Sequence, residues 1–390
     1  MNVLKMGSSR QNWPLTIMNI LSDDGRGGAD RLALDISKGL RRRGHRMIFG
    51  VPSSFFLMEE AREAGIEIFD LYPSGARDME VVPDLVNFCR KENVRILNAH
   101  QSFGRRMLLL SKLRGTDAKI VFTRHCIMST LPYLGAFHTN FLVDMNLAVS
   151  ETVRRSLLRA GIFPGKAVTV YGGIDMNKFV NAPPEKVEDL KKRYTRTGVF
   201  NIGIVARFSR EKNFRPDMRT MKGHEFLFRA LSRLSSGLNF NFNVLALGVC
   251  GEENAKGLKL VAEYNGLPRE VVTVCDFQHD IAPFYRLMDL NVLPSSNEGL
   301  GLALIEAMAS GVPSIGADSG GIREIIAGGE DGFLFRPGDS AGLAEKIRIL
   351  HEDKNLRDLF AGRGSEKVKK LFDIENSVSA TEDVFYALLN

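Results

Sequence analysis

The sequence predicts an α/β protein with two doubly wound domains, each built on a parallel sheet. Short apolar runs alternate with helical patterns along the whole chain. This alternation is typical of parallel sheets that are covered by helices on both faces. Thirteen such runs are too many for one doubly wound sheet, and the alternation restarts after a polar segment at 181–197 that contains Pro183 and Pro184. We therefore predict two Rossmann-like domains with a cleft between them.

Each half of the chain has its own set of strands. In the first half we predict strands at 15–21, 46–51, 66–71, 94–98, 119–123, 146–149 and 167–170. In the second half we predict them at 200–205, 244–248, 271–274, 290–294, 313–316 and 332–335. Helical spacing of apolar residues predicts helices between them, for example at 225–234, 302–310 and 341–350.

Composition excludes several classes of protein. Of the 390 residues, 44% are hydrophobic and 25% are charged, which is ordinary for a globular chain and unlike a disordered one. The apolar run at 15–21 is followed at once by Asp23 and Asp24, so it predicts a buried strand and not a signal peptide. Four distant cysteines without a CxxC pair predict a reducing cytoplasm, with no disulfide framework and no zinc site.

The positive charge is concentrated in the first half. Residues 1–184 carry 25 Lys and Arg against 17 Asp and Glu, whereas residues 185–390 carry 27 against 29. This asymmetry predicts an anionic partner, either a phosphorylated acceptor or an acidic lipid surface, and we expect no nucleic acid. In the stretch 104–114, Met107, Leu110 and Leu113 recur at helical spacing between basic residues. That pattern fits a helix resting on an anionic membrane, or equally a core-facing helix with solvated arginines.

Chemistry is expected in the loops that follow strands, because ligands of open parallel sheets bind beyond the carboxyl ends of the strands. The first such loop contains Gly27 and Gly28 and opens a helix, so its backbone can approach an anion. It is not a dinucleotide fingerprint, because Asp30 stands where the third glycine would be needed. A tight turn without a ligand is the alternative interpretation of this loop.

The strongest pattern lies at 294–313. Glu298 stands in a glycine-bearing loop after a predicted strand, and Glu306 follows eight residues later on a predicted helix. Eight residues are near two helical turns, so both carboxylates can face one ligand at different depths. The N–H groups of Gly299 and Leu300 can hold a phosphate while the carboxylates accept hydrogen bonds from hydroxyls. A ligand with a diphosphate and two sugar rings meets these demands.

These residues carry a resemblance to a known family. The pattern Glu298-x7-Glu306, followed by Gly-Val-Pro at 311–313 and by the motifs at 318–324 and 332–339, resembles the retaining glycosyltransferases of family 4, which have the GT-B fold. Weaker matches extend it over nearly the whole chain, at 27–31, 43–45, 148–150, 172–179, 205–207 and 211–213. The resemblance implies an acceptor-binding domain at 1–184, a donor-binding domain at 185–370, and a helical segment at 371–390 that packs back toward the first domain.

The resemblance also implies roles for single residues. Arg207 and Lys212 would hold the donor diphosphate, Glu306 the ribose hydroxyls, and Glu298 the transferred sugar beside the N–H groups of Gly299 and Leu300. Gly27 and Gly28 would line the site near the diphosphate and the acceptor. His125 would be the active-site histidine, whereas His100, which also ends a predicted strand, matches no motif and is expected to be a hydrogen-bonded structural residue.

One departure from the family pattern leaves the lysine open. Residues 214–221 intervene between the Glu-Lys pair at 211–212 and the expected helix start at Lys222. Lys212 keeps the spacing from Arg207, and Lys222 keeps the position before the helix. We favour Lys212, and we expect the insertion to be either a neutral surface loop or a part of the cleft rim.

The sequence has no Asp-x-Asp pair that would hold a metal on the donor. We therefore expect a reaction without metal or cofactor, in which Arg207, Lys212 and the helix start near Gly301 neutralise the leaving diphosphate. The reaction would occur on the front face with retention, and a covalent intermediate on Glu298 is the alternative mechanism.

The function expected from these observations is transfer of a sugar from a UDP- or GDP-sugar to a hydroxyl of a glycan, a lipid-linked molecule or a phosphorylated acceptor, in cell-envelope polysaccharide or lipopolysaccharide synthesis. We expect the enzyme in the cytoplasm, at most peripheral on the inner face of the membrane. The alternatives are a nucleotide-sugar epimerase of the same fold and a non-catalytic nucleotide-sugar-binding protein.

Overall fold

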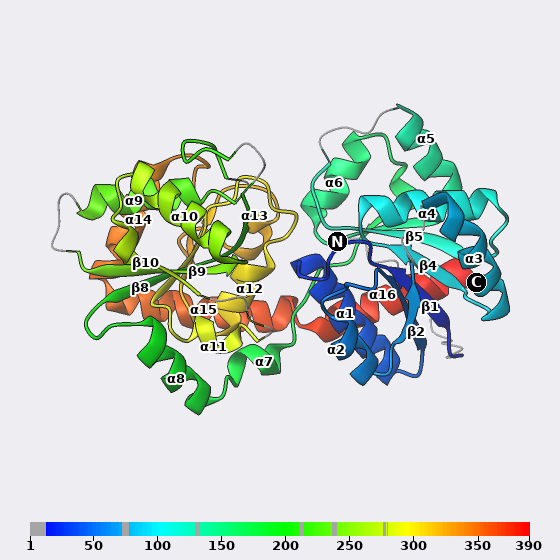
Figure 1. The fold of residues 1–390 in the computed structure, drawn as a ribbon, viewed down its shortest axis with the longest axis horizontal. Helices are drawn as coiled ribbons and strands as arrows, with labels where there is room; N and C mark the ends of the chain where they lie inside the picture. The colour runs from blue at the N-terminus through cyan, green and yellow to red at the C-terminus, as the bar shows by residue number, and fades with distance from the viewer. Residues whose placement is uncertain are drawn as a thin grey trace. The chain divides into compact units, whose positions relative to one another are not determined.

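Two parallel sheets organise the chain (Figure 1). A computed structural model describes residues 13–71, 78–128, 133–210, 214–220, 222–235, 240–275, 278 and 280–390. The first sheet has seven strands in the order β3-β2-β1-β4-β5-β6-β7, and the second has six in the order β10-β9-β8-β11-β12-β13. The predicted fold class is confirmed, and each predicted strand is present within a few residues of its expected bounds.

The strands of the first sheet are β1 (Thr16–Ile20), β2 (Arg46–Val51), β3 (Glu67–Asp70), β4 (Ile96–Ala99), β5 (Lys119–Arg124), β6 (Met145–Ala148) and β7 (Ala167–Thr169). Those of the second are β8 (Phe200–Phe208), β9 (Phe242–Val249), β10 (Val272–Val274), β11 (Leu290–Leu293), β12 (Ser314–Ala317) and β13 (Phe333–Phe335). In both sheets the order reverses beside the first strand, which opens a crevice at its carboxyl end.

Helices connect the strands. In the first half they are α1 (Gly28–Arg42), α2 (Met58–Glu63), α3 (Asp78–Lys91), α4 (Ser102–Leu113), α5 (Tyr133–Leu142), α6 (Glu151–Arg159) and α7 (Met176–Val180). In the second half they are α8 (Pro184–Tyr194), α9 (His224–Ser235), α10 (Glu252–Tyr264), α11 (Ala282–Tyr285), α12 (Leu302–Ala309), α13 (Ile322–Ile325), α14 (Ser340–Glu352), α15 (Lys354–Leu371) and α16 (Ile374–Leu389). The polar segment that we interpreted as a junction contains helix α8, which begins at Pro184 because proline fits a first helical turn.

By its contacts the described chain divides into two compact units. The first comprises residues 1–123, 138–145 and 382–390, and the second comprises residues 124–137 and 146–381. The second unit therefore includes the end of β5 and strands β6 and β7, together with the whole six-stranded sheet. Each unit is described here by itself.

In the first unit, α1 and α2 lie on one face of the sheet, and α3 and α4 lie on the other (Figure 1). The apolar core between the sheet and the second pair of helices includes Met18 and Leu97 from the strands, Leu85 from α3, and Met107 and Leu108 from α4. Met107 is fully buried, so it does not belong to a surface stripe on α4, which corrects that part of the membrane hypothesis. Leu113 at the end of the same helix is 67% exposed.

The end of α16 belongs to the first unit and is held there by polar contacts. Glu382 accepts hydrogen bonds from Arg43 at 2.8 Å and from His45 at 2.9 Å, and Tyr386 donates one to the carbonyl of Trp13 at 2.9 Å. Burial raises the pKa of Glu382, but its bonds to His45 and Arg43 outweigh burial and leave the pKa below its usual value. The carboxylate is therefore charged at neutral pH.

In the second unit, α14 packs on α9 and α15 packs on α12. Residues 172–174 join this unit at a crossing where Ile174 forms a parallel bridge with Asp373. Gly173 lies against the backbone of Phe372 and Asp373, so closely that a Cβ there would stand 2.7 Å from the Asp373 carbonyl oxygen. A glycine is needed for this crossing.

Candidate active site

The loop between β11 and α12 carries the predicted carboxylates, and it lies in the second unit. It starts at Pro294, includes Glu298, and ends at Gly301, the residue that caps α12. Gly301 has a φ of +105°, a left-handed conformation that favours glycine. The helix therefore begins where the sequence predicts it, and its N-terminus faces the loop that holds Glu298.

Glu298 is paired with Lys222. The ammonium of Lys222 donates to Glu298 Oε1 at 2.6 Å, and both side chains are largely buried, with 26% and 14% of their surfaces exposed. Gly223, which follows the lysine, has a φ of +75°, and a Cβ there would clash with the carbonyl oxygen of Pro294. Because the backbone of Gly223 lies against that of Pro294, Lys222 is positioned beside the start of the Glu298 loop.

The other predicted cations are less defined. Arg207 lies near the carboxyl end of β8 and is exposed. Lys212, which we favoured as the diphosphate lysine, lies outside the described residues. Of the two candidate lysines, Lys222 is therefore the one for which the structure gives a position, and that position is on Glu298.

The insertion before Lys222 is anchored at both of its described ends. The ring of Phe214 meets that of Phe208 edge-on, with centroids 6.1 Å apart. Thr220 donates to Glu225 Oε2 through its N–H at 3.1 Å and its hydroxyl at 2.6 Å. Glu225 is only 2% exposed, and its position in the first turn of α9 ties the end of the insertion to that helix.

Three neighbouring segments fix the backbone of the Glu298 loop. The hydroxyl of Ser150 donates to the carbonyl of Gly299 at 2.5 Å, and the N–H of Gly321 donates to the carbonyl of Glu298 at 3.0 Å. A Cβ on Gly299 would clash with the backbone carbonyl of His125, and one on Gly320 would clash with that of Glu298. The structure thus brings His125 next to the loop through its main chain.

Helix α6 is joined to the same region by a carboxylate. Glu324 accepts the backbone N–H of Glu151 at 2.9 Å and that of Thr152 at 2.7 Å, and also the hydroxyl of Tyr171 at 2.8 Å. An acidic side chain is favourable here because the first N–H groups of a helix have no partner within the helix. Burial, and then the bond to Glu324, raises the pKa of Tyr171, so its hydroxyl remains a donor at neutral pH.

Glu306 lies on α12, and its sequence neighbours Ile305 and Ala307 are fully buried. Its carboxylate accepts a hydrogen bond from the hydroxyl of Tyr285 at 2.7 Å. The partner that the sequence demanded for a carboxylate in an apolar run is therefore a tyrosine on α11.

The glycine loop of the first unit is held by Asp30. This carboxylate accepts the N–H of Gly27 at 3.2 Å and the side chain of Gln101 at 2.6 Å, while Gln101 also accepts the N–H of Ser22 at 3.0 Å. Burial is the largest cause that raises the pKa of Asp30, to about 6. The residue that excludes a dinucleotide fingerprint thus fixes the loop of Gly27 and Gly28.

His100 is buried in the first unit, where its Nε2 lies 3.1 Å from both Asn19 Oδ1 and Asn98 Nδ2. This agrees with its interpretation as a hydrogen-bonded structural residue. Among the residues that the structure describes, no three His, Cys, Asp or Glu side chains are grouped as metal ligands would be.

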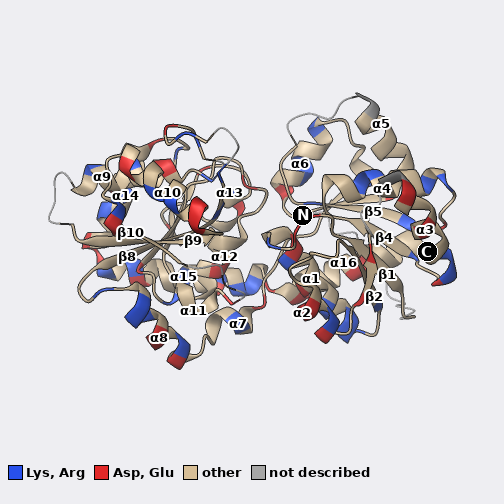
Figure 2. Cartoon of the chain, in the orientation of Figure 1, with Lys and Arg blue, Asp and Glu red and all other residues tan. Residues whose placement is uncertain are grey.

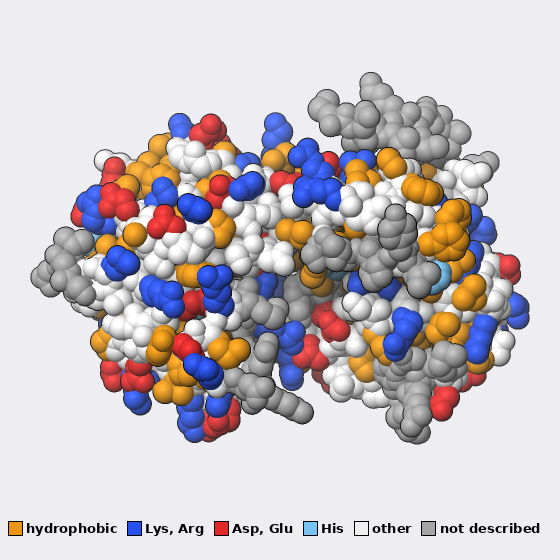
Figure 3. Space-filling model, turned by 90° about the horizontal axis from the view of Figure 1, so that it is seen from above, with side chains coloured by type: hydrophobic (Ala, Val, Ile, Leu, Met, Phe, Trp, Pro, Cys, Tyr) orange, Lys and Arg blue, Asp and Glu red, His pale blue; other side chains and the backbone are white. Residues whose placement is uncertain are grey.

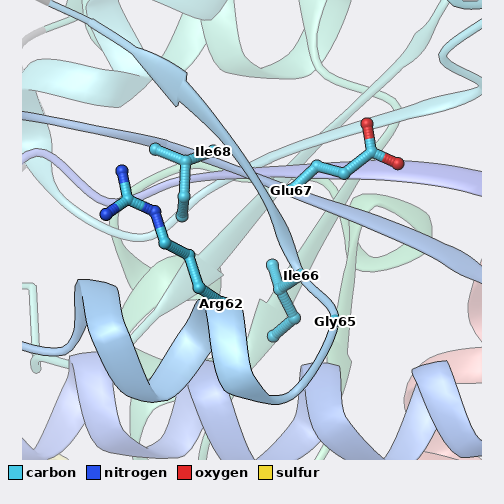
Figure 4. A pocket seen from close by; sticks show the side chains of 5 residues that line it. All are labelled: Arg62, Gly65, Ile66, Glu67 and Ile68. Carbon is cyan, nitrogen blue, oxygen red and sulfur yellow. The ribbon is translucent and has the colours of Figure 1, made fainter.

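A shallow depression in the first unit is a different feature (Figure 4). It is lined by Arg62, Gly65, Ile66, Glu67 and Ile68, at the amino end of β3. The ligand edge of a parallel sheet is the carboxyl edge, and Glu67 is already engaged by Arg46 through two bonds of 2.7 Å. The depression is therefore not a donor site.

Two sequence models of known families match the chain. The sequence model of glycosyl transferases group 1 matches residues 214–367, and that of glycosyltransferase family 4 matches residues 26–178. Together these matches span most of the chain. The chain belongs to glycosyltransferase family 4.

Relatives with assigned activities match at low identity. The N-acetyl-alpha-D-glucosaminyl L-malate synthase of Bacillus anthracis is 26% identical over 383 residues, which cover 93% of this chain and 94% of the relative. The lipopolysaccharide core biosynthesis mannosyltransferase LpcC of Rhizobium leguminosarum bv. viciae is 28% identical and covers 72% and 75% of the two chains. These proteins act on different molecules, so membership of the family does not identify a substrate.

Solved structures share the fold. Anabaena HepE in complex with UDP and glucose has a TM-score of 0.81 at 20% identity, covering 95% of this chain and 99% of that chain. A glycosyltransferase from Rickettsia africae has a TM-score of 0.81 at 21% identity, covering 97% and 99%. Both comparisons agree with a GT-B architecture for this glycosyltransferase.

Several residues around the loop were missed as functional by sequence reasoning. Ser150 and Glu324 stand in motifs that matched the family, but the motifs did not reveal that one hydroxyl and one carboxylate connect them. Tyr285 had no motif at all. The signal that could have found it is the half-buried carboxylate of Glu306 in an apolar run, which requires a donor somewhere in the fold.

Replacement of Glu324 by alanine should destabilise the glycosyltransferase, because two backbone N–H groups at the start of α6 lose their acceptor. We expect a loss of roughly 1–3 kcal/mol in the free energy of unfolding. Thermal unfolding should report this as a lower midpoint. Glu345→Ala is the matched control, since Glu345 is exposed on α14, where it pairs with Arg348. Equal midpoints for the two variants would contradict a role for Glu324 at the helix start.

Proposed function

We propose that this family 4 glycosyltransferase transfers a sugar from a UDP- or GDP-sugar to an acceptor hydroxyl with retention of configuration and without a metal ion. The observation that carries this proposal is the arrangement around one loop. Lys222 pairs with Glu298 at the mouth of the loop, and Glu306 lies eight residues further along on α12. A cation, helix N–H groups and two carboxylates are the groups that a diphosphate and two sugar rings need.

Lys222, not Lys212, is the lysine that we now assign to the donor diphosphate, together with Arg207. Its ammonium is 2.6 Å from Glu298, the residue proposed to contact the transferred sugar. An ammonium at this place can bind the diphosphate oxygens next to that sugar. Fixed cations and N–H groups stabilise the charge that develops on the leaving diphosphate, and they need no reorganisation during the reaction.

In the proposed reaction the bond between the sugar and the diphosphate breaks on the same face on which the acceptor oxygen bonds to the sugar. The departing diphosphate oxygen takes the proton of the acceptor hydroxyl, so the charges balance without a separate base. His125, whose main chain adjoins Gly299, would lie near the transferred sugar. Attack by Glu298 to give a covalent intermediate is the alternative mechanism.

The acceptor is proposed to be an anionic, hydroxyl-bearing molecule of cell-envelope polysaccharide or lipopolysaccharide synthesis. The excess of Lys and Arg over residues 1–184 supports an anionic acceptor. The named relatives support the range of acceptors, since one makes a glucosaminyl malate and another acts in lipopolysaccharide core synthesis.

The first half of the chain also presents a surface suited to an anionic membrane. No helix that the structure describes is long and apolar enough to cross a bilayer. Phe137 and Phe141 stand four residues apart on one face of α5 and are 58% and 63% exposed. Arg106 and Arg114 are exposed on α4 and directly after it, where Figure 2 shows basic residues. On the face seen in Figure 3, hydrophobic and basic side chains lie among acidic and uncharged ones. We propose that Phe141 and the basic residues of α4, which belong to one unit, contact acidic lipid headgroups, with the aromatic ring at the interface.

Product analysis tests the function. The protein should form a glycosylated product from one member of a panel of UDP- and GDP-sugars when a hydroxyl acceptor is added, with the anomeric configuration retained, and it should do so in excess EDTA. Epimerisation of the sugar without an acceptor would show the alternative activity of this fold. Binding without turnover would show a nucleotide-sugar-binding protein. Loss of activity in EDTA that Mg²⁺ or Mn²⁺ restores would overturn the metal-free mechanism.

Substitution of the diphosphate cations should slow turnover. Lys222→Ala and Arg207→Ala should each lower kcat by roughly 10²–10³, because each removes a fixed charge from the leaving group. Lys212→Ala, which removes the lysine before the insertion, should behave like the wild type. If Lys212→Ala were inactive and Lys222→Ala active in steady-state assays, the role would return to Lys212.

Cosedimentation with vesicles tests the membrane surface. Binding to vesicles with acidic lipids should be appreciable at low salt and fall as salt rises, because each basic residue near the surface contributes about 1 kcal/mol that is screened by ions. Phe141→Ser should weaken binding, whereas Tyr264→Ser, at a tyrosine 60% exposed on α10, should not. Equal binding to neutral and acidic vesicles would remove the electrostatic part of the proposal and favour a free phosphorylated acceptor.

A further inference from the structure

A buried tyrosine donates a hydrogen bond to Glu306, the carboxylate that we assign to the donor ribose. Tyr285 ends helix α11, has no exposed surface, and donates its hydroxyl to Glu306 Oε2 at 2.7 Å. The sequence motifs that carry the family resemblance do not include this tyrosine. Its only polar atom is nevertheless directed at a residue of the candidate site.

One aromatic contact holds the ring of Tyr285, and a second holds the residue before it on α11. Phe179, on α7, meets it at an angle of 62° with ring centroids 6.0 Å apart. The preceding residue, Phe284, is also fully buried, and its ring contacts that of Tyr194 with centroids 5.6 Å apart. Packing thus fixes the position of α11, and the tyrosine hydroxyl has one place to point.

In this pair the tyrosine is the hydrogen-bond donor and the glutamate is the acceptor. Burial, followed by the negative charge of Glu306, raises the pKa of Tyr285 well above its usual value. The phenol therefore keeps its proton at neutral pH, and it donates that proton in the hydrogen bond to the carboxylate of Glu306. A hydrogen bond to a charged group in a water-poor site is among the stronger ones in proteins.

We propose that Tyr285 is a positioning residue for recognition of the donor ribose. It anchors one oxygen of Glu306, which orients the carboxylate toward the two ribose hydroxyls of the nucleotide. This inference rests on the proposed function, because it takes Glu306 to be the ribose-binding residue.

Anchoring matters because a free glutamate side chain loses several rotatable bonds when it binds a ligand. The tyrosine fixes these bonds during folding, so the ordering does not weaken donor binding. Without the hydroxyl, Oε2 of Glu306 would lose this donor, and the carboxylate would sample more orientations. The nucleotide would then bind more weakly, and its ribose hydroxyls would contribute less to the binding free energy.

The test compares nucleotides that differ only in the ribose. Calorimetry would measure Kd for UDP, 2′-deoxy-UDP and 3′-deoxy-UDP, or for the corresponding guanosine diphosphates if the wild type prefers GDP. Wild type should bind the ribonucleotide more tightly than either deoxy analogue. Tyr285→Phe should weaken ribonucleotide binding roughly tenfold and narrow that preference, with the deoxy analogues affected less. In turnover, the donor KM should rise while kcat at saturating donor stays close to wild type.

Tyr194→Phe is the matched control, since it removes a tyrosine hydroxyl from the packing around the same helix without touching Glu306. It should leave the ribose preference unchanged. The preference is a ratio of two dissociation constants, so a variant that is partly unfolded still reports it correctly.

Glu306→Gln separates the two levels of the argument. If the wild type shows no ribose preference, or if Glu306→Gln keeps it, then Glu306 does not bind the ribose and the proposed site assignment fails together with this inference. If Glu306→Gln loses the preference but Tyr285→Phe keeps it in full, the site assignment stands and the positioning role of Tyr285 is overturned.

Discussion

The arrangement of the candidate site depends on the backbone of two residues, Glu298 and Gly299. Gly321 donates to the carbonyl of Glu298 and Ser150 to that of Gly299, and the absence of a side chain at Gly299 lets the main chain of His125 approach. Segments from three places in the sequence thus meet at one loop. Because main-chain atoms make these contacts, the loop can hold its N–H groups in fixed directions, which is what preorganised binding of a phosphate requires.

Each carboxylate around this loop accepts hydrogen bonds from its own donors. Glu298 has an ammonium, Glu306 a phenol, and Glu324 two backbone N–H groups with a second phenol. Charged oxygens are costly to bury unless donors surround them, so each pair fixes a side chain that would otherwise turn toward water. The partner of Glu298 is a lysine and the partner of Glu306 is a tyrosine, and these two side chains differ in mobility. A mobile ammonium can exchange its partner for a diphosphate, whereas a packed tyrosine cannot move.

Much of this could be predicted from the sequence, and the reasons are physical. The strands follow from short, mainly apolar runs, because most strand residues are buried beneath helices. The Glu298 loop and the start of α12 follow from Gly301, whose left-handed backbone needs glycine. Tyr285, by contrast, could not be paired with Glu306 from the sequence, since the two are joined only by the packing of α11 on α12. Met107 was ambiguous for a similar reason, because periodicity shows that a helix has an apolar face but not what covers that face.

The two candidate lysines differ in which sequence distance they keep, the distance from Arg207 or the distance to the start of α9. Counting from Arg207 favours Lys212, and counting back from the helix favours Lys222. An added loop changes the first distance at little cost, because closure entropy grows only slowly with loop length. The second distance is fixed by contact, since Gly223 lies against the carbonyl of Pro294 and α9 begins at the next residue. The hydrogen bond from the hydroxyl of Thr220 to Glu225 then connects the insertion to that helix. A residue bound to the start of a helix therefore keeps its place when the loop before it grows, and the lysine that reaches Glu298 is the one on the helix side of the insertion.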